Sequence, residues 1–408
     1  MQKKQIIPYV APVVTTRYNA AAMRKSLLRM VRVLASVLLF TALACSQRES
    51  HQVPDLFYLY HTYAVGKNPT NVVSGDINGD GWADLVTTNI GSDSLSILLG
   101  NGDGSFRDPM TLRVPEQPRA VILHDLNGDG LLDLAVANVG NNRVTILLGN
   151  GRGQFVQTDA YPAVKSPIAL ACADFNKDGR PDLAVALRND KLMILLGRGD
   201  GSFVQKALYE YGDTPTAVVA ADLNEDGILD LAVTQGGQMS SAVAIFLGKG
   251  DGTFHQPISY KTGHRPLGVS ILDLNGDRHL DMLVVNGEMD DITVFLGKGD
   301  GTFTKGTAFG ANAGPMAMVT GDFDGDGKTD VAVVNNLSSD VSIVLGKGDG
   351  TFWQPPRSYK TGAAPFAVAA VSFTSKDPRP GLVTANNLAS TISVFLAKDP
   401  RSHVVPVQ

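Results

Sequence analysis

The chain has 408 residues, of which 44% are hydrophobic, and it carries 43 glycines and a formal net charge of −5. This negative balance provides no broad basic surface for a phosphate backbone, which excludes nucleic acid as an expected partner. The many glycine and acidic residues, with only 7% aromatic residues, are typical of short strands joined by tight turns and argue against a helical architecture.

The first recognisable segment is an export signal within residues 1–44. An apolar run over residues 33–44 follows four basic residues, Arg24, Lys25, Arg29 and Arg32. The run is shorter than the ~20 residues that a membrane-spanning helix needs, so we expect a cleaved signal rather than a permanent anchor. Residues 1–22 do not resemble any part of a signal, which suggests that translation begins at Met23 or Met30.

Two processing routes end at the same bond. The segment Ala42-Leu43-Ala44 suits ordinary signal cleavage, whereas Cys45 resembles the acylated cysteine of bacterial lipoproteins. We expect lipidation of Cys45, so that residues 45–55 form a lipidated N-terminus and a short linker. The predicted location is the bacterial outer membrane or cell surface, otherwise the periplasm or the exterior, with membrane contact only through Cys45.

An acidic nine-residue motif then recurs about every 50 residues, a period typical of propeller blades. It occupies residues 76–84, 125–133, 174–182, 222–230, 273–281 and 322–330. A seventh copy at residues 372–381 has lost the acidic pattern but keeps the apolar segments on both sides. Seven units therefore follow the linker.

Each unit contains four strand-like runs, which predicts one four-stranded antiparallel blade per unit. In the second unit these are residues 120–123, 134–137, 144–148 and a less apolar run after Phe155. The last unit stops after its third run, residues 392–396, while an orphan run at residues 57–65 precedes the first. We expect the orphan run to complete the last blade and close the ring, rather than leave an open stack with unpaired edges. The predicted fold is an all-β, seven-bladed β-propeller over residues 56–398, followed by a C-terminal tail at 399–408.

The acidic motifs have the composition of calcium loops. Oxygen-bearing side chains stand at positions 1, 3, 5 and 9, a backbone carbonyl is available at position 7, and glycine usually stands at position 6. Magnesium fits less well because it prefers a tighter, more hydrated octahedron, and zinc prefers His or Cys. The expected ligands are Asp76, Asn78, Asp80, Trp82 and Asp84; Asp125, Asn127, Asp129, Leu131 and Asp133; Asp174, Asn176, Asp178, Arg180 and Asp182; Asp222, Asn224, Asp226, Ile228 and Asp230; Asp273, Asn275, Asp277, His279 and Asp281; and Asp322, Asp324, Asp326, Lys328 and Asp330.

About six Ca²⁺ sites are therefore expected, and stability should depend on calcium. The Asp273 loop should be the weakest, because Arg278 replaces the glycine that a left-handed turn favours. Six phenylalanines that follow a Gly-rich turn are expected to pack between blades: Phe106, Phe155, Phe203, Phe254, Phe303 and Phe352.

These motifs resemble the FG-GAP and VCBS-type repeats, related to the propeller of integrin α chains. The resemblance covers residues 56–398 and rests on Asp-Leu-Asn-Gly-Asp-Gly-x-x-Asp-Leu together with Leu-Gly-x-Gly-Asp-Gly-x-Phe. It implies a calcium-binding propeller in which the acidic loops and Gly-rich turns share one face. The decayed seventh copy departs from the pattern and implies six sites rather than seven.

The opposite face is then the expected ligand face. It should carry the asparagines that follow the second run of each unit and basic residues of the links between units: Asn89, Asn138, Asn286, Asn335, Asn386, Arg119, Lys165, His264 and Arg265. Asn and Arg can hydrogen-bond sugars or acidic groups, although each asparagine alone would more commonly cap a strand end.

Three functions remain open on the sequence. The first is an adhesion or protein-interaction module that binds an unknown protein or glycan, the second is a carbohydrate-binding lectin, and the third is a polysaccharide-acting enzyme such as a lyase. We expect no enzymatic activity, because none of the seven histidines recurs beside a Ser, Cys or Glu partner. His124 beside Asp125 is the nearest to a catalytic pair, and Cys172 is expected to be a small core residue.

Overall fold

The computed structural model describes residues 55–237, 241–374 and 377–398. The predicted signal, Cys45 and the tail at 399–408 lie outside them. Within the described residues the regular structure is β-strand, and no helix there is long and apolar enough to cross a membrane.

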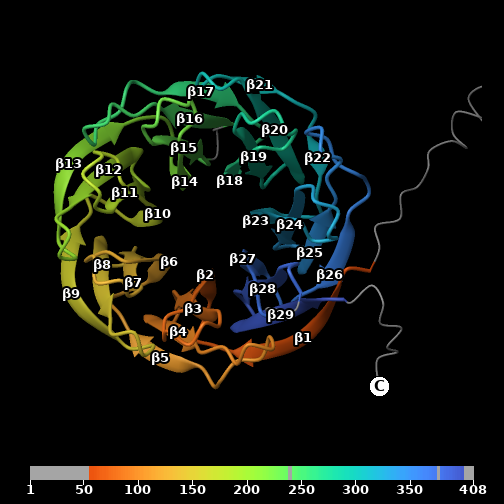
Figure 1. Ribbon diagram of the computed structural model, residues 1–408, viewed down its shortest axis with the longest axis horizontal. Coiled ribbons are helices and arrows are strands. Elements are labelled where there is room, and N and C mark those ends of the chain that lie inside the picture. Colours follow the sequence, from red (N-terminus) through yellow and green to blue (C-terminus); the bar gives the residue numbers. More distant parts are fainter. Residues whose placement is uncertain (1–54, 238–240, 375–376, 399–408) are drawn as a thin grey trace, which may run out of the picture. The chain divides into compact units, whose positions relative to one another are not determined.

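The strands form seven antiparallel sheets around a ring (Figure 1). The first blade contains β2 (Pro69–Gly75), β3 (Asp84–Asn89), β4 (Ser94–Leu98) and β5 (Met110–Arg113), and the second β6 (Pro118–His124), β7 (Asp133–Asn138), β8 (Arg143–Gly149) and β9 (Phe155–Pro162). The third contains β10 (Pro167–Ala173), β11 (Asp182–Leu187), β12 (Lys191–Gly197) and β13 (Phe203–Glu210), and the fourth β14 (Pro215–Ala221), β15 (Asp230–Gln235), β16 (Ala242–Phe246) and β17 (Ile258–Lys261).

The fifth blade contains β18 (Pro266–Leu272), β19 (Asp281–Asn286), β20 (Asp291–Gly297) and β21 (Phe303–Lys305), with the short β22 (Phe309–Gly310) also paired to β20. The sixth contains β23 (Pro315–Gly321), β24 (Asp330–Asn335), β25 (Asp340–Val344) and β26 (Arg357–Lys360). The seventh contains β27 (Pro365–Val371), β28 (Gly381–Asn386), β29 (Thr391–Ala397) and β1 (Phe57–Ala64).

The N-terminal strand closes the ring, as predicted. β1 pairs antiparallel with β29, from Phe57 opposite Ala397 to Ala64 opposite Thr391. In addition, the innermost strands of the first and seventh blades, β2 and β27, contact each other as neighbouring blades do elsewhere. The last blade is thereby completed from the other end of the chain, and its third strand is not left as an exposed edge.

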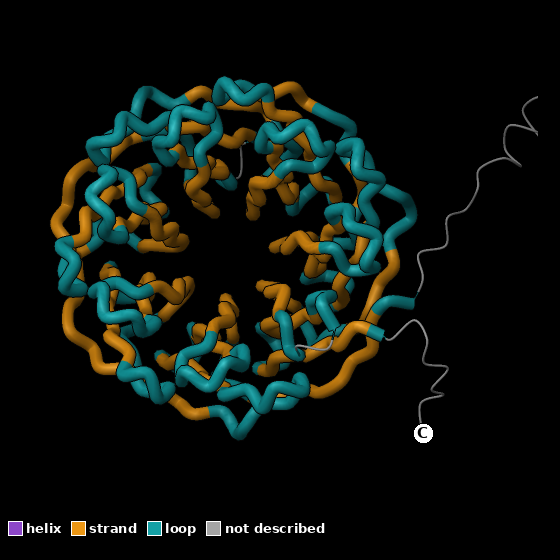
Figure 2. The backbone as a smooth tube through the Cα atoms, viewed as in Figure 1, coloured by secondary structure: helices purple, strands orange, loops and turns teal. Residues whose placement is uncertain are grey.

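The sequence of each strand follows from its place in the blade. The second strands are buried along their whole length, which explains their continuous apolar runs, such as Leu134–Val136 within β7. The innermost strands are partly buried, and the outermost strands, such as β5, are mainly exposed. Figure 2 shows the strands of each blade following one another outward from the centre, with loops joining them.

Neighbouring blades are joined by aromatic contacts, as predicted for the recurring phenylalanines. All six of these side chains are buried. In four interfaces the Phe backbone N–H also donates to a tyrosine hydroxyl from the preceding blade: Phe106 to Tyr63, Phe203 to Tyr161, Phe254 to Tyr209 and Phe303 to Tyr260. Tyr359 likewise accepts from the N–H groups of Leu56 and Phe57, so Phe57 is the seventh member of the series.

Candidate metal sites and the opposite face

The ninth position of each acidic loop is a buried carboxylate that holds two segments together. Asp84 shows the pattern: one oxygen accepts the N–H of Ile77 at 3.1 Å and the other accepts the N–H of Gly100, in the Gly-rich turn, at 2.7 Å. The same two bonds recur at Asp133, Asp182, Asp230, Asp281 and Asp330, all of which are 0–1% exposed. Each loop is therefore folded onto the Gly-rich turn of its own blade.

The first and fifth positions shape the loop itself. The Asp at position 1 accepts the backbone N–H of position 6, as Asp76 does from Gly81 at 2.8 Å, and the Asp at position 5 accepts that of position 7, as Asp80 does from Trp82 at 2.9 Å. Both bonds are present in all six loops. Side-chain oxygens thus face the interior of each turn, as the sequence pattern predicts.

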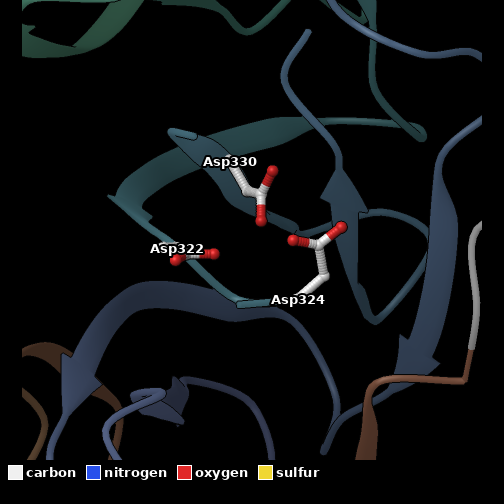
Figure 3. A group of neighbouring side chains, drawn as sticks. All are labelled: Asp322, Asp324 and Asp330. Atoms are coloured by element: carbon white, nitrogen blue, oxygen red, sulfur yellow. The ribbon is translucent and has the colours of Figure 1, made fainter. Parts of the chain in front are cut away.

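The sixth loop brings three carboxylates together (Figure 3). Asp322, Asp324 and Asp330 each place an oxygen within 4.8 Å of the others. The carboxylate of Asp326 is turned toward Lys328, whose ammonium lies 2.8 Å away. Of the five positions predicted to bind metal in this loop, the structure therefore gathers the side chains of positions 1, 3 and 9, and position 5 has an internal cation as its partner.

In the other five loops an asparagine stands at position 3, and its amide donates to the position 5 carboxylate, as Asn78 does to Asp80 at 2.9 Å. The equivalent pairs are Asn127 with Asp129, Asn176 with Asp178, Asn224 with Asp226, and Asn275 with Asp277. At positions 1, 3, 5 and 9 these loops therefore carry one fewer carboxylate than the sixth loop.

The buried carboxylates are destabilised as anions. Burial raises the pKa of Asp330 to about 7, with the negative charge of Asp324 adding to the effect. Burial also raises the pKa of both Asp182 and Asp230 to about 6, again with further contributions from acidic loop neighbours. A cation bound between such oxygens would offset both burial and repulsion, and an oxygen-only donor set suits a hard divalent ion. The residues therefore fit calcium.

The prediction of a left-handed backbone at Arg278 is confirmed, since its φ is 73°. Position 4 of the loops also has a left-handed backbone, which the sequence reasoning missed. Lys177 and Glu225 adopt φ values of 61° and 60° there, where the other loops have glycine. Oε1 of Glu225 also lies 2.6 Å from Nδ1 of His279 in the next blade. A side chain of the fourth loop therefore contacts the fifth loop.

The acidic loops also connect neighbouring blades. The backbone carbonyl at position 2 accepts an N–H from the third glycine of the next blade's Gly-rich turn, as Ile77 does from Gly153 at 3.2 Å. The same bond joins Phe175 to Gly252, Leu223 to Gly301, and Leu274 to Gly350. An ordered acidic loop therefore stabilises both its own blade and the following interface.

The seventh loop is built differently. Gly381 stands at the start of β28, where the other blades have the buried aspartate, and a side chain there would collide with the ring of Phe373. Arg379 instead pairs with Asp377 at 2.7 Å and donates to the carbonyl of Lys398 at 2.7 Å. In this blade the guanidinium of Arg379 is the cation that pairs with the acidic residue of the loop.

The opposite face requires a correction. The five asparagines expected on it, Asn89, Asn138, Asn286, Asn335 and Asn386, are fully buried. Their amides bond within or beside their own blade, as Asn386 does to Ser393 at 2.9 Å, because they end strands that are buried along their whole length. They are thus out of reach of a ligand in this structure, and we leave them out of the ligand face.

The basic residues expected on that face are accessible to different degrees. Lys165, His264 and Arg265 are exposed, and Nδ1 of His264 lies 3.2 Å from the Ser241 hydroxyl. Arg119 is half-buried and lines a central cavity.

The sequence reasoning missed an exposed apolar group on the same face. Met289, Leu337 and Leu388 lie in the loops between the second and third strands of blades five, six and seven, and are 52%, 77% and 71% exposed. We call these three residues the apolar patch. Comparing the repeats could have revealed it, because two of the earlier blades carry a glycine, Gly91 or Gly140, two residues after the strand-ending asparagine, where Leu337 and Leu388 stand.

Two other residues singled out in the sequence have structural surroundings. Nδ1 of His124 lies 3.1 Å from the carbonyl of Asp125. Cys172 is packed beside a hydrophobic cluster, and burial raises the pKa of its thiol to about 12, which suppresses the reactive thiolate.

Comparison with known proteins assigns the family. A model of the FG-GAP-like repeat matches six overlapping segments, residues 76–136, 125–185, 174–233, 224–284, 273–333 and 322–374. The chain therefore belongs to the FG-GAP-like repeat family. The search of curated proteins gives no significant match.

Solved structures share the fold at low sequence identity. A crystal structure of BBS1N in complex with ARL6DN, soaked with lead, aligns with a TM-score of 0.59 and 12% identity, covering 85% of this chain and 99% of that one. The same complex soaked with mercury aligns with a TM-score of 0.61 and 13% identity, with the same coverage. At this identity the likeness establishes the propeller fold alone.

Proposed function

We propose that this protein is a calcium-stabilised propeller of the cell envelope that binds another protein through one asymmetric region and does not catalyse a reaction. The observation that carries the proposal is the apolar patch. Apolar side chains with this exposure, in corresponding loops of three consecutive blades, favour a protein-interaction surface. A sugar-binding propeller would be expected instead to repeat equivalent polar pockets around the ring.

Three further features support the proposal. The acidic loops provide oxygen ligands in six blades, so that bound calcium would fix the loops that join neighbouring blades. Exposed Lys165, His264 and Arg265 lie in the links between blades and could pair with acidic groups of a partner. The solved structure of similar fold is a complex of BBS1N with a second protein, ARL6DN.

A capture experiment tests the binding role. The calcium-loaded protein is immobilised and exposed to an envelope extract, and the retained proteins are compared with those held by a variant carrying Met289→Ser, Leu337→Ser and Leu388→Ser. A matched control carries Val156→Ser and Val204→Ser, which are exposed apolar residues on outermost strands. A partner retained by the wild type and the control but lost by the patch variant supports the proposal.

The proposal fails if the patch variant retains the same proteins as the wild type. A parallel glycan array, with calcium and with EDTA, addresses the sugar-binding alternative, since calcium-dependent binding of one glycan class by both variants would replace our proposal with a lectin function.

The number of calcium ions bound per chain can be measured separately. We expect equilibrium dialysis against ⁴⁵Ca²⁺ to give about six bound ions per chain, one for each acidic loop. Binding of fewer than three ions at millimolar calcium would contradict the assignment of the loops as a set.

The envelope location rests on Cys45, outside the described residues. We expect the protein to partition into the detergent phase of Triton X-114, and Cys45→Ser to move it to the aqueous phase. Aqueous partition of the unchanged protein would contradict lipidation and leave secretion through ordinary cleavage.

A further inference from the structure

The centre of the ring contains a cavity of about 390 Å³. All seven innermost strands contribute to it, and Figure 1 shows these strands, β2, β6, β10, β14, β18, β23 and β27, around the centre. Its volume lies in the range of small-molecule pockets. The lining comes from no acidic loop, so the cavity is separate from the candidate metal sites.

Arg119 is the only residue of these seven strands that carries a fixed charge. The strands read PTNVVSG, PRAVILH, PIALACA, PTAVVAA, PLGVSIL, PMAMVTG and PFAVAAV, with no Lys, Asp or Glu and with His124 at the far end of β6 from Arg119. Arg119 follows the initial proline of β6, and the equivalent residues of the other strands are Thr70, Ile168, Thr216, Leu267, Met316 and Phe366. The repeat shows that the fold does not need an arginine here.

The guanidinium of Arg119 has no ion-pair or hydrogen-bond partner among the described residues. The backbone carbonyl of the same residue accepts hydrogen bonds from the hydroxyls of Thr70 and Thr88. Burial lowers the pKa of Arg119, and the one charged group that adds to this effect is another cation, Arg188. A partly buried cation without a counter-ion is destabilising, and an anion bound beside it would offset that penalty.

The rest of the lining suits an apolar body. Ile168, Leu267, Met316, Met318 and Phe366 all line the cavity. Thr70 and Thr216 also reach it, but their hydroxyls already donate to backbone carbonyls, at 2.9 Å and 2.7 Å. The cavity therefore offers one unpaired cationic group within largely apolar walls.

We propose that the central cavity binds a small organic carboxylate, whose charged group pairs with the guanidinium of Arg119 and whose apolar body lies against Met316, Met318 and Phe366. A guanidinium and a carboxylate match in a two-bond geometry. This site is independent of the apolar patch and of the acidic loops.

The test uses 4-phenylbutyrate as the probe, with its neutral amide, 4-phenylbutanamide, for comparison. The full chain is prepared with ¹³C-methyl methionine in calcium-containing buffer, and binding is followed by the methyl signals of Met316 and Met318, assigned by single Met→Leu variants. Met110 and Met289 are exposed and serve as reporters of non-specific binding. We expect the carboxylate to shift the two cavity methyls and leave the exposed ones unchanged.

Arg119→Thr is the decisive variant, because threonine occupies the equivalent position in the first and fourth blades. Hydrogen bonds to charged groups contribute about 1.5–3 kcal/mol, so carboxylate affinity should fall about 10- to 150-fold. Arg119→Lys should lose less, because it keeps the charge, and Arg113→Thr, on the exposed strand β5, should bind like the wild type.

The proposal is overturned by any of three results. These are no shift of the cavity methyls at millimolar 4-phenylbutyrate, equal affinity of the wild type and Arg119→Thr, or equal affinity of the wild type for the carboxylate and the amide. A melting temperature of Arg119→Thr equal to or above that of the wild type would show that loss of binding does not come from misfolding.

Discussion

The sixth and seventh blades are neighbours whose segments between the first and second strands differ in charge. The sixth loop places the carboxylates of Asp322, Asp324 and Asp330 close together. The seventh has Gly381 in place of the buried carboxylate, and its Asp377 pairs with Arg379. Both loops still connect an innermost strand to a fully buried second strand. The blade therefore does not require the acidic residues to form, and their presence in the other six loops supports our proposal that these loops bind a cation.

The largest effect should come from withdrawing calcium from all six acidic loops at once. We expect EDTA to lower the melting temperature by about 10 °C or more, since a site at 100-fold its dissociation constant contributes about 2.7 kcal/mol and several such sites act together. Differential scanning calorimetry with and without calcium measures the shift. Identical melting in the two buffers would show that the acidic loops, like the seventh, are stable without a bound cation.

The buried aspartate should matter even without metal. Asp330→Ala leaves the N–H groups of Phe323 and Gly346 without their acceptor in a buried site, at a cost of about 3 kcal/mol in the free energy of unfolding. Urea unfolding in EDTA measures this loss. Asp326→Ala is the matched variant, because Asp326 lies in the same loop but is exposed, and its loss in EDTA should be smaller. Equal losses would show that the two buried bonds contribute little.

The stability of the seventh blade should depend on its internal ion pair and not on calcium. Arg379→Ala removes bonds to Asp377 and to the Lys398 carbonyl from a side chain that is 11% exposed, so we expect a loss of about 2 kcal/mol. The loss should be the same in calcium and in EDTA, with Arg113→Ala, on an exposed strand, as the control. A loss seen only in calcium would link this blade to the metal sites and remove the contrast.

The sequence predicted the repeat, the ring closure by β1 and the burial of the recurring phenylalanines because each of these depends on local pattern and period. It failed where burial is decided by neighbouring strands. The asparagines that end the second strands looked like surface residues, but Asn335 and its equivalents end strands packed on both faces. The apolar patch and the unpaired charge of Arg119 arise from differences between blades, and their meaning depends on what surrounds them in space.

A single substitution can make the sixth loop resemble the other five. Asp324→Asn removes one of three crowded carboxylates, so in EDTA we expect the protein to become more stable by about 1 kcal/mol, because like charges are separated. In calcium the same change should weaken binding to this loop, and the advantage should shrink or reverse. Paired urea titrations in the two buffers report the change of sign. Destabilisation of similar size in both buffers would mean that Asp324 acts through its hydrogen bonds rather than its charge.

The smallest expected effect concerns the fifth loop, where the backbone and not the charge departs from the pattern. Arg278 adopts a φ of 73° that a side chain disfavours, while the equivalent Gly327 of the sixth loop adopts 81°. Arg278→Gly relieves about 1 kcal/mol of strain but adds freedom to the unfolded chain, so the net gain should be a few tenths of a kcal/mol. The reciprocal variant, Gly327→Arg, should lose about 1 kcal/mol. If calcium affinity in the fifth loop rises in Arg278→Gly while stability in EDTA barely changes, the glycine acts mainly by letting the loop close around the ion. Unchanged affinity would contradict the expectation that this loop is the weakest of the six because of Arg278.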